Sequence, residues 1–110
     1  MDMGTDGKIL GQNKPAADTD VALYTVPAAT EGLVSVFVCN VSAVLETFRV
    51  GTVKSGNALD WDRDAIMFDV PVNPNSTTQV TGLALGAGEA IHVRSGDGGV
   101  VFNAIGLETT

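Results

Sequence analysis

The feature that most constrains the fold is a series of short segments in which apolar and β-branched side chains alternate. It is clearest in residues 21–41, where Val34, Val36 and Val38 fall on one face of the chain and Phe37 falls on the other. Alternation with a period of two is typical of β-strands. A turn segment with Pro and Gly separates the two apolar runs of this stretch. We therefore predict two strands joined as a β-hairpin.

Segments of the same kind continue along the chain, with Gly, Pro, Asn and Asp between them. Ile66, Phe68 and Val70 are expected to share one face of their strand, and Pro71 near its end suggests a sheet edge or a strand terminus. No stretch longer than one or two turns has the apolar spacing of a helix. The pattern predicts an all-β fold, a single antiparallel β-sandwich or jelly-roll-like domain of seven or eight strands. Strands after the hairpin are expected at residues 44–54, 65–72, 77–85, 90–94 and 100–108.

The N-terminal segment differs in composition from the remainder of the chain. A length of 110 residues favours one domain, and in residues 1–18 Ile9 and Leu10 are the only large apolar residues after the two N-terminal methionines. We predict an extended N-terminal arm over 1–18, with a short strand at 8–12, followed by a sandwich domain over 19–110. Such an arm is expected to become ordered when it lies across a neighbour.

Net charge argues against two classes of partner, and cysteine content excludes an internal disulfide. Six basic and thirteen acidic residues give a net charge of -7. This argues against nucleic acid and against an anionic membrane surface, because both need a basic face. The single cysteine, Cys39, excludes an internal disulfide and is predicted to be a small core hydrophobe. The acidic N-terminus indicates no secretory signal, and no window approaches the ~20 apolar residues of a membrane span.

The sharpest cluster of charge lies at residues 60–64, where three aspartates alternate with Trp61 and Arg63. This resembles the start of a calcium-binding loop. The full pattern would require Gly and Glu at the positions where Ala65 and Pro71 stand, so an EF-hand is excluded. The main interpretation is an exposed acidic polar loop at residues 58–64. A looser calcium site and a subunit contact through Trp61 remain alternatives.

No combination of residues predicts an active site. His92 stands between two apolar residues and is expected to point away from the core, and no Gly-x-Ser-x-Gly motif is present. The glycine-rich segment 95–99 lacks the following helix and nearby Lys of a phosphate-binding loop, so a tight turn is predicted. We expect no enzyme activity and no cofactor.

Several short motifs recur together over nearly the whole chain. They are Lys8–Gln12, Pro15–Ala17, Leu23–Ala28, Val36–Asn40, Thr47–Val50 and Phe102–Glu108. In this order they resemble motifs of small virion proteins of tailed bacteriophages. Chains of this size in that group are head decoration (cement) proteins, which are small β-sandwich or jelly-roll units that form trimers over the joints between capsomers. Related β modules occur in tail fibres and host-adsorption structures.

The resemblance implies a non-enzymatic capsid decoration protein. Such a protein would be made in the bacterial host cytoplasm and would bind, as a homotrimer, the outer surface of the shell formed by the major capsid protein. The alternative is a tail-fibre or host-adsorption module that binds cell-surface carbohydrate. We also expect a neighbouring subunit to cover the Phe37 face of the hairpin. The candidate partner or subunit contacts are Ile9, Leu10, Gln12, Phe37, Trp61 and Arg63.

Overall fold

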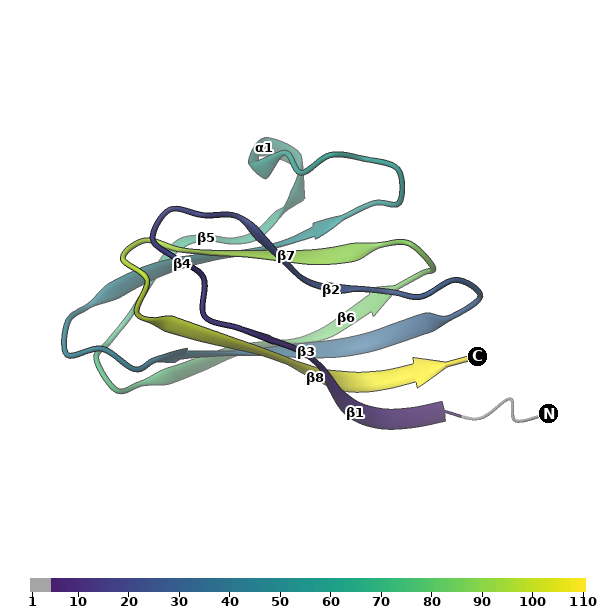
Figure 1. The fold of residues 1–110 in the computed structure, drawn as a ribbon, viewed down its shortest axis with the longest axis horizontal. Coiled ribbons are helices and arrows are strands. Elements are labelled where there is room, and N and C mark those ends of the chain that lie inside the picture. Colours follow the sequence, from purple (N-terminus) through teal and green to yellow (C-terminus); the bar gives the residue numbers. More distant parts are fainter. Residues whose placement is uncertain (1–4) are drawn as a thin grey trace.

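The computed structural model describes residues 5–110, which form two four-stranded antiparallel sheets and one helical turn (Figure 1). Sheet A contains, in spatial order, β1 (Thr5–Asn13), β8 (Val100–Thr109), β3 (Glu31–Asn40) and β6 (Thr77–Leu85). Sheet B contains β2 (Val21–Thr25), β7 (Ala90–Ser95), β4 (Glu46–Val53) and β5 (Ala65–Val72). The prediction of an all-β sandwich is confirmed. Among the described residues, no helix is long and apolar enough to cross a membrane.

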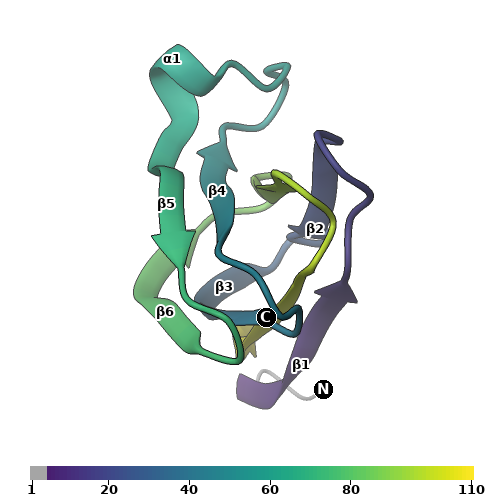
Figure 2. The same cartoon turned by 90° about the vertical axis from the view of Figure 1, so that its left-hand side faces the viewer.

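The order of the strands is that of a jelly roll. Of the seven connections between consecutive described strands, only the one from β4 to β5 stays within a sheet, and the others cross from one sheet to the other. The β4–β5 connection contains α1 (Trp61–Asp64), which continues directly into β5 and lies beside β4 (Figure 2). The predicted polar loop at residues 58–64 therefore contains one helical turn.

The predicted hairpin is wrong, although both of its strands exist. β2 pairs with β7 in sheet B, whereas β3 pairs with β6 and β8 in sheet A. The reason lies in the connection between the two strands, because Val26 and Thr30 are buried there. The Val26 N–H donates to the carbonyl oxygen of Glu89 at 2.9 Å. Burial of Val26 thus carries the chain across the end of the core instead of turning it back in one sheet.

The core lies between the two sheets. Val34, Val36 and Val38 of β3 point into it and are at most 1% exposed, as the period-two pattern predicts. Phe48 of β4 and Phe102 of β8 meet edge to face across the core, with ring centroids 6.2 Å apart. Such an aromatic pair stabilises the contact beyond its buried area by about 0.5–1.5 kcal/mol.

The edge strand β5 is irregular. Its pairing with β4 shifts register twice, and the shift between Met67 and Val70 contains Asp69, which has a positive φ of 50°. The shift is a β-bulge, which turns the following side chains to the other face. Ile66 and Phe68 are consequently about half exposed, while Val70 packs against the core. The prediction that Ile66, Phe68 and Val70 share one face is wrong, and the edge position suggested by Pro71 is confirmed.

Residues 5–13, which are predicted to belong to an extended arm, form β1. This strand pairs with β8 along its whole length, from Thr5 opposite Thr109 to Asn13 opposite Phe102. Lys8 Nζ lies 2.8 Å from Glu108 Oε1 and reinforces the pairing. The order expected from a neighbour is thus supplied by β8 of the same chain. Residues 1–4 of the predicted arm lie outside the described residues.

Candidate functional site

Part of the outer face of sheet A, over β1, β8 and β3, is apolar. Strand register places Ile9 beside Ile105, and Leu107 beside Leu33. Phe37 lies two residues after Ser35, the residue of β3 that is opposite Ile105, and it is half-buried next to Asn103. We call this surface the apolar face and define it by Ile9, Leu33, Phe37, Ile105 and Leu107. Four of these side chains are well exposed, with exposed fractions of 58% for Ile9, 48% for Leu33, 40% for Ile105 and 42% for Leu107.

The apolar face also lacks charge. The four strands of sheet A contain four charged residues, and Asp6, Lys8 and Glu108 alternate with the residues of the apolar face, so they belong to the opposite side. Only Glu31, at the start of β3, shares the face. The outer face of an antiparallel sheet is normally polar. An uncharged apolar face on a chain with a net charge of -7 is therefore a candidate association surface.

The structure brings together three of the six predicted contact residues on this side of sheet A. Ile9 and Phe37 belong to the apolar face, and the Gln12 amide donates to Asn103 Oδ1 at 2.6 Å beside Phe37. Leu10 turns inward at the register shift in β1 and packs against the core. The core position predicted for Cys39 is wrong, because Cys39 alternates with inward-pointing valines and is half-buried on the outer side of β3.

The prediction missed Leu33, Ile105 and Leu107. A signal for the two residues of β8 was present in the sequence. Residues 100, 102 and 104 are apolar on one face of that strand, and 105 and 107 are apolar on the other. A strand with two apolar faces needs cover on both sides, and the described domain covers only one.

A second apolar surface is the connection between β3 and β4. Val41, Val44 and Leu45 are 53%, 57% and 54% exposed. We call residues 41–45 the apolar loop. It lies at the end of the sandwich opposite to the C-terminus (Figure 1). It contains no charged residue.

Buried polar side chains hold the apolar loop in shape. The Asn40 side chain is fully buried, and its Nδ2 donates to the carbonyl oxygens of Val44 at 2.7 Å and Val72 at 3.0 Å. Its Oδ1 accepts from the backbone N–H and the hydroxyl of Ser42. Every hydrogen-bonding group of the Asn40 amide is therefore used at the base of the loop.

Glu46 anchors the other end of the loop. Its carboxylate is buried and accepts from the backbone N–H groups of Asp97 and Gly99, each at 3.3 Å, and from the Ser95 hydroxyl at 3.4 Å. A Cβ at Gly99 would lie 2.7 Å from Glu46 Oε2, so this close approach requires glycine. The loop is thus pinned to the β7–β8 connection and presents its apolar side chains in a fixed arrangement.

The remaining two predicted contact residues lie on α1. Asp60 caps this helical turn, and its carboxylate accepts from the Asp62 N–H at 3.0 Å. The Trp61 ring packs over Gly51 on the outer face of sheet B, and its Nε1 donates to Asp20 at 3.1 Å. Trp61 is therefore half-buried against its own domain.

The Trp61 ring also meets Phe68 edge to face, with centroids 6.3 Å apart. The Arg49 guanidinium lies over the Phe68 ring at 4.0 Å and forms an ion pair with Asp69 at 2.7 Å. Arg49 is thereby held between an aromatic ring and a carboxylate, and half of the Phe68 side chain stays exposed.

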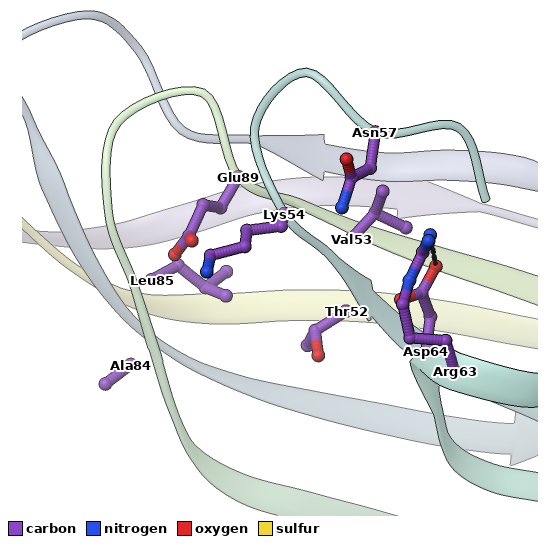
Figure 3. A pocket seen from close by; sticks show the side chains of 9 residues that line it. All are labelled: Thr52, Val53, Lys54, Asn57, Arg63, Asp64, Ala84, Leu85 and Glu89. Carbon is purple, nitrogen blue, oxygen red and sulfur yellow. Dashed lines mark hydrogen bonds and ion pairs between the residues drawn. The ribbon is translucent and has the colours of Figure 1, made fainter. Parts of the chain in front are cut away.

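Arg63 is engaged within the α1 region. It binds both carboxylate oxygens of Asp64, at 2.8 and 2.9 Å, and also donates to the carbonyl oxygen of Ala58. The Arg63 guanidinium, together with the backbone N–H of Asp60, lowers the pKa of Asp64 to about 2. This pair lines an open pocket of about 320 Å³ at one end of the sandwich, which also contains Lys54 (Figure 3).

The chemistry available in the described residues is limited. Over residues 5–110, no group of three His, Cys, Asp or Glu side chains is arranged to hold a metal ion, so the calcium alternative gains no support. His92 lies on the outer face of sheet B, as predicted, opposite Gly51 in the register. Burial lowers its pKa.

Comparison with known proteins adds no relative. A scan against protein-family models matches no family, and a search of curated proteins finds no matching protein. The fold and the site define the chain as a jelly-roll β-sandwich with two uncharged apolar surfaces, the apolar face and the apolar loop.

Proposed function

We propose that the chain is a non-enzymatic structural protein of a bacteriophage particle, a capsid decoration protein. In this proposal it binds, as a homotrimer, the outer surface of the shell of major capsid protein at capsomer joints, and it stabilises that shell. The observation that carries the proposal is the apolar face, since an acidic protein gains little from exposing four large apolar side chains to water. Cover by another protein chain accounts for this face.

Other features support an architectural role. The N-terminal strand is tied into sheet A, and the apolar loop is fixed by buried hydrogen bonds. A rigid unit binds without a large entropic cost of ordering. Jelly-roll domains are common in viral capsids and in lectins, which is support by fold analogy only. The motif resemblance to phage virion proteins favours the capsid among these, and the acidic remainder of the surface suits a dispersed particle.

Binding to shells tests the proposal. Purified protein is mixed with expanded shells of the phage that encodes it, after the shells have been stripped of this protein. We expect it to sediment with the shells and to raise the temperature at which they break. Shells that neither bind the protein nor gain stability would contradict the proposal.

A second candidate is a host-adsorption module that binds cell-surface carbohydrate. The observation that favours it is the exposed half of the Phe68 ring beside the Arg49–Asp69 ion pair, because sugars stack on aromatic rings and hydrogen-bond to charged groups. A glycan array with and without calcium tests this candidate. Binding that is lost in Phe68→Ser and kept in Ile66→Ser would favour adsorption over decoration, and no binding in either condition would exclude it.

A further inference from the structure

We propose that the apolar loop of one copy packs on the apolar face of a second copy, so that copies of this chain associate head to tail. The inference rests on the proposed function for the size of the assembly, a trimer. It adds which two surfaces form the contact between subunits.

The distribution of exposed apolar side chains motivates this pairing. Nine large apolar side chains are well exposed among the described residues. Four belong to the apolar face and three to the apolar loop, and the remaining two, Ile66 and Phe68, lie on β5. One pairing between copies therefore covers seven of the nine.

The two surfaces lie apart on the chain. Leu33 is near the start of β3, and Val41 follows the end of the same strand, eight residues later. At about 3.3 Å per residue this separation is roughly 26 Å. Phe37 is the nearest residue of the apolar face on this strand, roughly 13 Å from Val41, so the loop of a chain lies beyond one end of its own apolar face and does not cover it. A second copy can supply it, because each copy carries both surfaces.

Charge favours a second copy as the occupant. Two chains of net charge -7 repel each other unless they meet through uncharged surfaces. The apolar loop has no charged residue, and the apolar face has only Glu31 at its end. These surfaces allow close approach without placing carboxylates together. A basic partner would gain nothing from either surface.

The dimensions fit a contact between subunits. The four strands of sheet A, up to ten residues long, cover about 33 by 19 Å, or roughly 600 Å², and the apolar face occupies the part over β1, β8 and β3. A standard interface buries about 800 Å² on each partner. The face lies on one partner and the loop on the other, and the outer face of sheet A alone is roughly three quarters of the area that one partner needs. The loop is already held by Asn40 and Glu46, so little conformational entropy is lost when it docks.

Symmetry separates this contact from the simpler pairing of face on face. Two apolar faces packed on each other would form a two-fold dimer and would leave the apolar loop uncovered. A loop-to-face contact joins two different surfaces, and such contacts close into rings or continue as filaments. A ring gives every copy two contacts and leaves no apolar loop free.

The experiment uses three single variants of the whole chain. Ile105→Lys alters the apolar face, and Leu45→Lys alters the apolar loop. Ile66→Lys is the control, since Ile66 is 47% exposed and lies on the other sheet. Circular dichroism confirms that each variant folds. Sedimentation velocity at about 50 µM then measures the assembly.

We expect wild type and Ile66→Lys to sediment as the same oligomer, and Ile105→Lys and Leu45→Lys to sediment as monomers. Mixing Ile105→Lys with Leu45→Lys should give a dimer, because Ile105→Lys keeps an intact apolar loop and Leu45→Lys keeps an intact apolar face. Two outcomes would overturn the inference: a wild-type monomer, or a mixture that stays monomeric. Shell binding is measured separately, so a decoration protein that binds as a monomer is distinguished from failure of the proposed function.

Discussion

The side-chain amide of Asn40 donates to the carbonyl oxygen of Val44 at 2.7 Å and thereby ties a fully buried residue to an exposed apolar loop. The same amide donates to Val72 of β5, so one side chain joins the ends of two strands to the loop. Buried polar groups that are fully hydrogen-bonded fix a local structure, and they are costly to disturb. The shape of the apolar loop therefore depends on a residue that never reaches the surface.

Replacement of Asn40 by alanine should destabilise the fold and loosen the apolar loop. It removes the donor from the buried carbonyl oxygen of Val72, which costs about 1–3 kcal/mol, and it leaves the carbonyl oxygen of Val44 with the Ser42 hydroxyl at 3.0 Å as its remaining donor. Urea unfolding measures the loss of stability, and hydrogen exchange measures the opening of the loop. Ser42→Ala serves as the control and should cost less than about 1 kcal/mol, because Ser42 is only half-buried. Equal losses in the two variants would contradict the central role of Asn40.

Neighbouring residues on β3 should respond differently to polar substitution. Val36 is 0% exposed, so Val36→Asp buries a charge without a partner and should abolish folding, at a cost above about 4 kcal/mol. Phe37 is half-buried on the outer side, so Phe37→Ser should cost less than about 2 kcal/mol and weaken assembly first. Thermal unfolding and sedimentation separate the two effects. Equal loss of monomer stability would show that Phe37 acts within one subunit.

The contact between Trp61 and Gly51 predicts a sensitive position on sheet B. A Cβ at residue 51 would lie 2.8 Å from the Trp61 ring and 2.9 Å from the Asp64 carbonyl oxygen. Gly51→Ala should therefore cost about 1–3 kcal/mol and shift the fluorescence of the single tryptophan. Gly86→Ala is the matched control, since its Cβ would meet Glu89 at an ordinary 3.6 Å. A variant at residue 51 as stable as the control would show that Trp61 does not pack there.

Acid should remove part of the stability through Asp64. Its pKa falls from the ordinary 3.8 to about 2 in the folded protein, because Arg63 and the Asp60 N–H bind the carboxylate. A lowered folded pKa stabilises the fold above the unfolded pKa, and this stabilisation is lost as the pH falls from about 4 to about 2. Asp64→Asn and Arg63→Gln should both flatten the fall of the melting temperature in that range. An unchanged acid dependence in both variants would contradict this role of the pair.

The sequence predicts which residues form strands better than it predicts which strands pair. The segments 65–72 and 77–85 agree with β5 and β6, because local alternation and turn residues decide where a strand begins and ends. Pairing depends on the connections. Burial of Val26 sends β2 and β3 into different sheets, which the pattern of residues 21–41 does not reveal.

Only part of the candidate surface can be predicted from the sequence, because it too depends on which strands pair. Ile9, Gln12 and Phe37 lie together because β8 aligns β1 with β3, and no feature of a single strand predicts that alignment. The bulge at Asp69 likewise places Phe68 outside and Val70 inside. One positive φ reverses the alternation that the sequence predicts, and it is set by pairing with β4.

The location of the protein on phage particles tests the proposed function most directly. Imaging of virions labelled on this chain by electron microscopy distinguishes the head from the tail. The proposal predicts label over the outer surface of the head, in repeated positions at capsomer joints. Label confined to the tail or its fibres, with none on the head, would contradict a decoration protein.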